Sequence, residues 1–314
     1  MTRKIFISME PEAEPDWRRV LGERIAASGM DLDILPPDAD PSEVNYLVYN
    51  IDGGIRDFSA FTQLRAILNT WAGVEAVLAE LDWPAHIPLT RMVERGMTLG
   101  MAEYFTGHVM RYHLDIDRFI ADSAEGLWQK WSPPLAEMRT IGILGLGELG
   151  QAAAGLLTGL GFNVTGWSRT AKSVPGVTCR HGTSGLAETL KMAEILIVIL
   201  PLTDATRNIV NADTLAMLPK GACIINAGRG PLIDDDALLA ALAEGQIRHA
   251  TLDVFREEPL PPDHPYWRNP RVTVTPHIAS ITRTDTACEA ILEQIARDMD
   301  GKPLLHVVDR GRGY

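Results

Sequence analysis

Three short segments each place a polar side chain just after an apolar run that is typical of a buried strand. The segments span residues 224–230, 252–260 and 274–279. They supply a fixed cation, a carboxylate and an imidazole, which are Arg229, Glu258 and His277. Open α/β sheets bind ligands at the carboxyl ends of their strands. Reduction of a keto acid needs such a set, because a cation holds the carboxylate and the carbonyl while an acid protonates the developing alkoxide.

Each of these residues also fits an ordinary structural role when it is considered alone. A histidine at a strand end is as often structural, an arginine such as Arg229 often forms a surface ion pair, and Glu258 fits a solvated position. The sequence offers no metal site, because the three cysteines lack the spacing of metal ligands. His108 and His113 are five residues apart, which places them on different faces of a helix.

A glycine-rich turn connects a predicted strand, Thr140–Leu144, to an alanine-rich predicted helix, Gln151–Leu160. In its G-x-G-x-x-G pattern the first glycine permits a tight turn, the second lets the backbone approach a pyrophosphate, and the third allows close helix packing. N–H groups at the start of the helix then face the anion. A glycine turn without a ligand is the alternative, but a second strand ends at Trp167, about twenty residues on, as in dinucleotide-binding domains. The candidate cofactor-binding residues of the turn are Gly145, Gly147, Glu148, Leu149 and Gly150.

The end of that second strand distinguishes between NAD and NADP. Enzymes that use NAD usually carry Asp or Glu there, which accepts hydrogen bonds from the ribose hydroxyls. This chain instead offers Ser168, Arg169, Thr170 and Lys172. The hydroxyls can donate hydrogen bonds to a 2′-phosphate, and the guanidinium can pair with it or stack. A solvated loop arginine is the alternative, but the pattern favours NADP, with NADPH preferred over NADH.

The order of these segments and their amino-acid sequences resemble those of the D-isomer-specific 2-hydroxyacid dehydrogenase family. The likeness covers nearly the whole chain and is strongest from Gly142 to Ala279. Within the family the similarity is greatest to the glyoxylate/hydroxypyruvate reductase branch, through residues 167–170, 253–262 and 281–283. The resemblance implies an NADPH-dependent enzyme that reduces glyoxylate and hydroxypyruvate, which are small 2-keto acids, to glycolate and D-glycerate.

The family pattern also implies a role for each candidate residue. His277 is the acid/base, Glu258 is its carboxylate partner and Arg229 clamps the substrate. Around the nicotinamide end of the cofactor the pattern places Leu200, Pro201, Leu202, Ala227 and Asp253.

The substrate loop departs from the common family pattern, in which a glycine-rich loop is followed by Asp. Here residues 69–75 read Asn-Thr-Trp-Ala-Gly-Val-Glu. The backbone N–H groups of Ala72, Gly73 and Val74 can still hold a carboxylate, because no particular side chain is needed. Trp71 either fills the space that a larger substrate would need or packs in the ordinary way.

Short apolar runs alternate with helical patterns along the chain, which indicates α/β layering with parallel sheets. We expect two Rossmann-like or flavodoxin-like domains with the active site in the cleft between them. Residues 1–99 and 286–314 form a discontinuous substrate-binding domain, and residues 100–285 form the dinucleotide-binding Rossmann domain. Strands are expected at residues 4–8, 32–35, 46–48, 66–68, 140–144, 163–167, 195–200, 222–226, 250–254 and 272–275. Helices are expected at residues 16–27, 74–81, 101–121, 151–160 and 284–299.

The composition limits the classes of protein to consider. Hydrophobic residues make up 46% and charged residues 22% of the 314 residues, which is ordinary for a globular protein. A net charge of −12 argues against a broad basic face for nucleic acid. No apolar stretch has the length of a membrane span or the pattern of a signal peptide. We expect a cytoplasmic enzyme without a nucleic-acid or membrane partner, and the resemblance, with the long helical pattern over 101–121, favours a homodimer.

Two other functions fit parts of the pattern. One is another D-2-hydroxyacid dehydrogenase, for example a phosphoglycerate dehydrogenase. The other is a nucleotide-sensing binding protein like the corepressor relatives of the family. A pure binder has no need of Arg229, Glu258 and His277 together, which favours an enzyme, although the corepressor relatives retain these residues.

Overall fold

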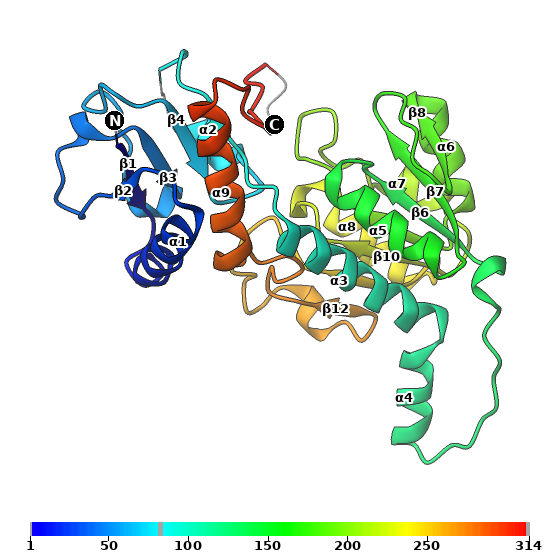
Figure 1. Ribbon diagram of the computed structural model, residues 1–314. Coiled ribbons are helices and arrows are strands. Elements are labelled where there is room, and N and C mark those ends of the chain that lie inside the picture. The colour runs from blue at the N-terminus through cyan, green and yellow to red at the C-terminus, as the bar shows by residue number, and fades with distance from the viewer. Residues whose placement is uncertain (1, 81–83, 312–314) are drawn as a thin grey trace. The chain divides into compact units, whose positions relative to one another are not determined.

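The computed structural model describes residues 2–80 and 84–311, which form two units (Figure 1). The first unit consists of Met1–Met97 and Thr282–Tyr314, and the second of Thr98–Ile281. The second unit is thus inserted into the chain of the first. The chain passes between the units twice, after Met97 and after Ile281. At both points the boundary expected from the sequence lies a few residues after the observed one.

The first unit is built on a five-stranded parallel sheet with the order β2-β1-β3-β4-β5. This is the strand order of the flavodoxin-like fold. All four residues of β3 and of β4 are buried, since both faces of the sheet are covered. The strands are β1 (Arg3–Ser8), β2 (Leu32–Ile34), β3 (Tyr46–Tyr49), β4 (Ala66–Asn69) and β5 (Leu89–Thr90).

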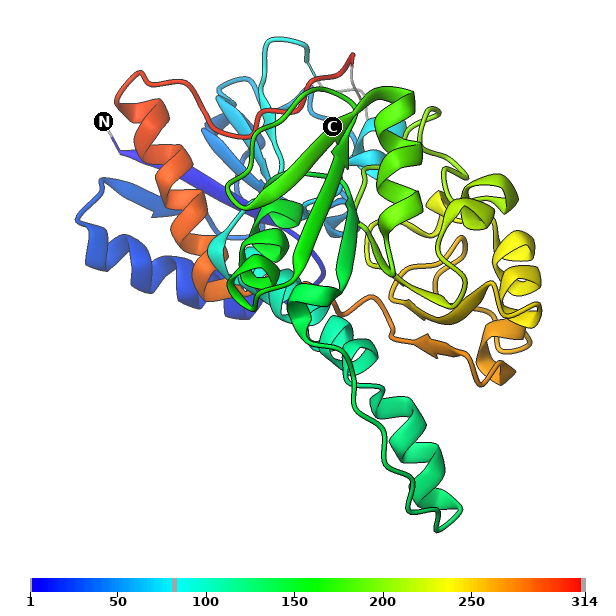
Figure 2. The ribbon, with the colours of Figure 1, turned by 90° about the vertical axis from the view of Figure 1, so that its right-hand side faces the viewer.

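Neighbouring residues of these strands contact opposite layers, as the two-residue period of a strand requires. Tyr46 donates a hydrogen bond to Asp298 of α9, whereas Leu47 belongs to the core on the other face. Helices α1 and α9 pack against each other, and Figures 1 and 2 show them side by side. The helices of the first unit are α1 (Glu14–Ser28), α2 (Glu75–Glu80) and α9 (Thr284–Met299).

The second unit is built on a seven-stranded parallel sheet with the order β12-β11-β10-β9-β6-β7-β8. Counted from β6, this is the 3-2-1-4-5-6 order of the Rossmann fold, extended by β12. The order reverses between β6 and β9, which makes their carboxyl ends the switch point where such folds bind ligands. The strands are β6 (Thr140–Leu144), β7 (Asn163–Ser168), β8 (Val177–His181), β9 (Ile195–Val198), β10 (Ala222–Asn226), β11 (Ile247–Leu252) and β12 (Val272–Val274).

Helices cover both faces of this sheet, and each face has its own apolar core. One core joins α3 and α5 to the sheet, and the other joins α6, α7 and α8 to it. The helices are α3 (Arg95–His113), α4 (Ile116–Ala124), α5 (Glu148–Gly159), α6 (Gly182–Met192), α7 (Ala212–Met217) and α8 (Asp235–Ala243). Short 3₁₀ segments are η1 (Pro41–Glu43), η2 (Ile51–Gly53), η3 (Ala136–Met138), η4 (Gly230–Leu232) and η5 (Pro265–Arg268). The α/β architecture with two parallel sheets confirms the predicted fold class.

The single helix predicted over residues 101–121 was wrong. α3 ends at His113, and α4 starts at Ile116 after Asp115 adopts a left-handed conformation with φ of 53°. Aspartate tolerates this conformation better than most residues, and the Arg248 side chain donates a hydrogen bond to its carboxylate. Figures 1 and 2 both show α4 extending away from the sheet of the second unit.

None of the helices in the described part of the chain combines the length and the apolar character that a bilayer span requires.

Candidate functional site

Glu258 and His277 form a hydrogen-bonded pair. His277 Nδ1 lies 2.6 Å from Glu258 Oε2, and the other carboxylate oxygen accepts the N–H of Phe255 at 2.8 Å. The side chain of His277 is 55% exposed. Because Nδ1 is engaged by the carboxylate, Nε2 is the ring nitrogen that can reach a ligand.

The pair shifts the two pKa values in opposite directions. The hydrogen bond with Glu258 raises the pKa of His277, against the opposing effect of burial. Burial acts to raise the pKa of Glu258, but hydrogen bonds from His277 and Phe255 outweigh it, so that this pKa is lowered. The charge of Arg229 acts on both groups. The arrangement thus favours an imidazolium beside a carboxylate.

A buried carboxylate holds the turn that carries His277. The backbone of His277 is left-handed, with φ of 55°, which is unusual for a residue with a side chain. Asp253 is 1% exposed. Its Oδ1 accepts hydrogen bonds from Ile278 N–H at 2.9 Å and from the Thr275 hydroxyl at 2.6 Å, and its Oδ2 accepts Ala279 N–H at 2.9 Å. These bonds stabilise the turn, a function that the sequence did not indicate for Asp253.

Asn226 holds the turn that carries Arg229. This last residue of β10 is 1% exposed. Its amide donates to Arg229 O at 3.1 Å, and its Oδ1 accepts Gly228 N–H at 3.1 Å. Its backbone carbonyl accepts Asp253 N–H at 2.9 Å, which links the two turns. The sequence prediction gave Asn226 no role, although an amide at the end of an apolar strand was the available signal.

The segment that follows β9 lies against the Arg229 turn. A Cβ at Gly228 would lie 3.0 Å from the carbonyl oxygen of Leu200, so that the glycine permits this approach. Ala227 and Leu200 are buried, whereas Pro201 and Leu202 are partly exposed. The structure therefore brings residues 200–202 and Ala227 to the carboxyl ends of adjacent strands.

The glycine turn has the geometry that its spacing predicts. Gly145 has φ of 115°, and a Cβ there would lie 2.4 Å from Ile199 O. A Cβ at Gly150 would lie 1.9 Å from Gly145 O, whereas one at Gly147 would meet no heavy atom of the described residues within 4 Å. Gly147 is the N-cap of α5, whose first residue is Glu148, and it has no side chain to cap the helix. The open space and the helix N-terminus fit a pyrophosphate.

The end of β7 presents hydroxyl and cationic groups. Ser168 is the last residue of β7, and its hydroxyl donates to Thr170 O at 2.8 Å. Arg169, Thr170 and Lys172 are exposed. Because residues 166–172 include no acidic side chain, the local charge fits a 2′-phosphate better than a pair of ribose hydroxyls.

The candidate substrate loop belongs to the first unit and follows β4. The carbonyl of Trp71 accepts hydrogen bonds from Asn69 Nδ2 and from Met92 N–H, both at 2.9 Å. The carbonyl of Thr70 accepts the Thr282 hydroxyl at 3.0 Å. These bonds fix the backbone that precedes the N–H groups of residues 72–74.

The side chain of Trp71 packs against the apolar core of the first unit. Val74 is buried in the same core, while Ala72 and Gly73 are partly exposed. This packing is the ordinary role that the sequence left open for Trp71.

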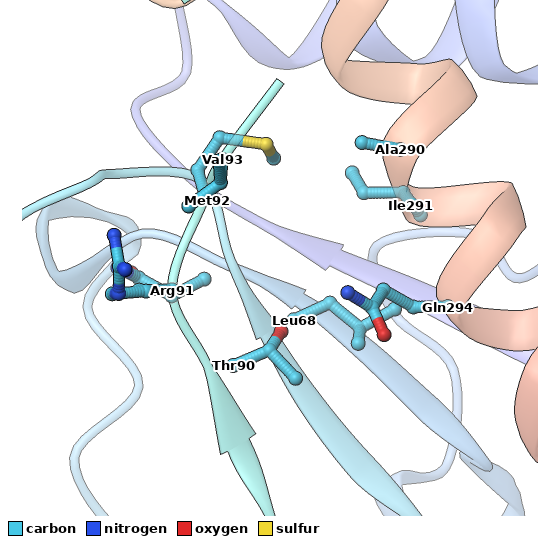
Figure 3. A pocket seen from close by; sticks show the side chains of 9 residues that line it. Leu68, Thr90, Arg91, Met92, Val93, Ala290, Ile291 and Gln294 are labelled. Atoms are coloured by element: carbon cyan, nitrogen blue, oxygen red, sulfur yellow. The ribbon is translucent and has the colours of Figure 1, made fainter. Parts of the chain in front are cut away.

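A small cavity lies behind this loop, between β4, residues 90–93 and α9 (Figure 3). Leu68, Met92 and Ile291 contribute to its lining. Its volume of about 10 Å³ is at the lower limit for a single water molecule. The cavity is too small for a keto acid, although Asn69 Oδ1 is buried there without a hydrogen-bond partner among the described residues. No group of three or more potential metal ligands is gathered anywhere in residues 2–80 and 84–311.

Comparisons with known proteins agree with the motifs. The NAD-binding domain of the D-isomer specific 2-hydroxyacid dehydrogenases matches residues 106–279. Glyoxylate/hydroxypyruvate reductase A of Yersinia enterocolitica is 40% identical over 257 residues, which are 80% of this chain and 82% of the relative.

Solved structures extend the likeness to the whole chain. A D-isomer specific 2-hydroxyacid dehydrogenase from Xanthobacter autotrophicus Py2, in complex with NADPH and MES, is 41% identical with a TM-score of 0.92. An NADPH-dependent glyoxylate/hydroxypyruvate reductase from Sinorhizobium meliloti, in complex with NADP and sulfate, is 33% identical with a TM-score of 0.87. Both alignments cover 100% of each chain. The chain therefore belongs to the D-isomer specific 2-hydroxyacid dehydrogenase family, as the sequence motifs predicted.

Proposed function

We propose that this protein is an NADPH-dependent reductase of small 2-keto acids, which converts glyoxylate to glycolate and hydroxypyruvate to D-glycerate. The observation that carries the proposal is the pairing of His277 with Glu258 at 2.6 Å, within the field of Arg229. The names of similar proteins support the substrates. Solved relatives that were crystallised with NADPH or NADP support the cofactor.

The second unit supplies the groups that hold the cofactor. The N–H groups at the start of α5, next to the open space over Gly147, bind the pyrophosphate. The 2′-phosphate is bound by Ser168, Arg169, Thr170 and Lys172. NADPH, when bound, supplies the hydride that is added to the carbonyl carbon of the substrate.

His277 supplies the proton that completes the reduction. Its Nε2 would donate a proton to the carbonyl oxygen, which becomes the hydroxyl of the product, while the bound cofactor would supply the hydride. Glu258 holds Nδ1–H and stabilises the protonated ring. Arg229 binds the substrate carboxylate and polarises the carbonyl. The backbone N–H groups of residues 72–74, in the first unit, can also bind a carboxylate.

A substrate panel tests the proposal. NADPH oxidation is measured with glyoxylate, hydroxypyruvate, pyruvate, phenylpyruvate and an uncharged aldehyde, and kcat/KM is compared. Glyoxylate and hydroxypyruvate should give the highest values. The aldehyde should be poor, because it lacks the carboxylate that Arg229 holds. Absence of turnover with every keto acid would leave a binding protein, whereas a preference for phenylpyruvate would overturn only the small-substrate preference.

We infer that the protein is a homodimer and that residues 114–138, here called the arm, contact the second copy. Every residue of α4 is at least partly exposed, and the arm extends away from the sheet in both Figure 1 and Figure 2. Trp128 is 92% exposed and Ile120 is 63% exposed. A concentration of exposed large apolar side chains on one segment is typical of an interface. Other exposed apolar residues of the arm are Leu114, Ile116, Leu127, Trp131, Leu135 and Met138.

A further inference from the structure

The loop that carries Arg229 is in direct backbone contact with the loop that carries Glu258. A Cβ at Gly230 would lie 1.9 Å from the carbonyl carbon of Phe255 and 2.4 Å from Arg256 N. Only a residue without a side chain permits this approach. Since Gly230 follows Arg229 and Phe255 bonds to the Glu258 carboxylate, this contact sets the spacing of the two charged groups.

The side chain of Arg256, which follows Phe255, forms further bonds from the Glu258 loop to neighbouring segments of the second unit. Its Nη2 donates hydrogen bonds to the carbonyl of Ile233 and to Asn208 Oδ1. Its Nε lies 3.3 Å from Asp235 Oδ2. These partners belong to the start of α8 and to the loop before α7. One planar guanidinium with donors in a rigid fork therefore joins three segments of the second unit.

Asp235, the carboxylate partner of Arg256, is itself bonded to a buried residue. The hydroxyl of Tyr266 donates to Asp235 Oδ1 at 3.0 Å, and Tyr266 is 2% exposed. Burial and the nearby Asp235 carboxylate raise the pKa of Tyr266, which keeps it protonated as a donor. Asp235 thus has one oxygen for the buried tyrosine and one for Arg256.

We propose that Arg256 is a positioning residue, which holds residues 255–258 so that the Glu258 carboxylate stays against His277. Arg256 lies within the turn that the bond from Phe255 N–H to Glu258 Oε1 closes. Fixing its side chain to Ile233 and Asp235 fixes that turn relative to the Arg229 loop. The inference rests on the proposed function, because it requires Glu258 to act on His277.

If Arg256 positions Glu258, replacing Arg256 should change the pH dependence of the reaction. The charged groups that act on His277 are Glu258, Arg229 and Asp253, and a change at Arg256 reaches the imidazole through the turn that carries Glu258. If the 255–258 turn loosens, the His277–Glu258 bond weakens and the raised pKa of His277 falls. The alkaline limb of reductase activity then moves to lower pH, because the proton donor is lost earlier.

The experiment compares Arg256→Ala, Arg256→Lys and Glu258→Gln with the unmodified protein. For Arg256→Ala we expect the alkaline limb of kcat/KM to move down by up to about one pH unit and kcat/KM to fall by roughly tenfold. Arg256→Lys keeps the charge but not the planar fork of donors, and it should restore only part of the loss. In the double variant with Glu258→Gln, removal of Arg256 should add little further shift, since both changes act through one bond.

Two further variants separate positioning from stability alone. Arg271→Ala removes the hydrogen bond from the Arg271 side chain to the carbonyl of Leu242, which joins the residue before β12 to α8 at the amino end of the sheet, opposite the carboxyl ends that carry the site. It should lower Tm about as much as Arg256→Ala and leave the pH profile in place. Asp235→Asn weakens the ion pair with Arg256 without changing any residue of the 255–258 turn. It should move the alkaline limb of kcat/KM in the same direction as Arg256→Ala, but by less.

The outcomes distinguish this inference from the proposed function. If Glu258→Gln moves the limb and Arg256→Ala lowers only Tm, Arg256 is structural, the inference fails and the proposed function stands. If Glu258→Gln itself leaves the limb in place, the proposed role of Glu258 fails, and this inference fails with it. A shift in Arg256→Ala that Arg256→Lys reverses in part and Arg271→Ala lacks supports the inference.

Discussion

The hydrogen bond between His277 and Glu258 extends the pH range over which His277 stays protonated. Because this bond raises the pKa of His277, the protonated form persists to higher pH and is lost as pH rises through the raised value. Glu258→Gln removes the negative charge and lowers that pKa. We expect the alkaline limb of reductase activity to move to lower pH, measured as kcat/KM for glyoxylate across pH.

Glu257 provides a matched control for this change. It is the preceding carboxylate in the chain and it is exposed. Glu257→Gln alters the net charge by the same amount and should leave the limb unchanged. An unmoved limb in Glu258→Gln would remove Glu258 from the mechanism.

Among the four residues proposed to bind the 2′-phosphate, we expect Arg169 to contribute most to the choice of cofactor. A charge-assisted hydrogen bond contributes about 1.5–3 kcal/mol, so Arg169→Ala should lower kcat/KM for NADPH roughly ten- to a hundredfold. The value for NADH should change little, because NADH has no 2′-phosphate. Lys191→Ala, which removes an exposed cation at the end of α6, is the control and should affect neither cofactor. Equal losses with NADPH and NADH would show that Arg169 does not bind the 2′-phosphate.

Among the elements, α4 and the rest of the arm expose the apolar surface on which the inferred dimer depends. Ile120 is 63% exposed, and a charge at this position would be buried by a second copy. We expect Ile120→Glu to shift the protein from dimer to monomer in sedimentation velocity experiments. Met192→Glu changes an exposed apolar residue of α6 in the same way and should leave the dimer intact. A monomeric unmodified protein would contradict the inference directly.

The sequence predicts some elements to the residue and misses others for identifiable reasons. β6 and β10 match their predicted bounds, because strands buried on both faces are continuous apolar runs. β8 and α6 were missed, since β8 is an edge strand with exposed positions and α6 begins with residues that are typical of loops. The break at Asp115 was missed because its partner, Arg248, comes from a distant strand.

In the candidate site, too, local patterns were predictable from the sequence and long-range contacts were not. The positions of Arg229, Glu258 and His277 after strands were visible in the sequence, and the structure confirms that Glu258 and His277 are bonded. The contact of Gly230 with Phe255 and the bonds of Arg256 were not visible. They join residues that are far apart in the chain, and no local spacing marks them.

At the scale of the whole molecule, the residues proposed for the reaction are divided between the two units. The acid/base pair, Arg229 and the glycine turn belong to the second unit, while the loop at residues 70–74 belongs to the first. Each unit has its own parallel sheet and its own apolar core. The two sets of proposed site residues are therefore supported by separate cores.

The insertion of the second unit into the first has a consequence for biosynthesis. α9 supplies buried residues to the first unit and packs on α1, yet it is translated only after Ile281, the last residue of the second unit. Domains usually fold in the order in which they leave the ribosome. Here we expect the reverse order: a nascent chain arrested once Ile281 has emerged should resist protease over residues 98–281 while residues 1–97 are still cleaved. Protection of the N-terminal segment at that stage would show that it folds without α9.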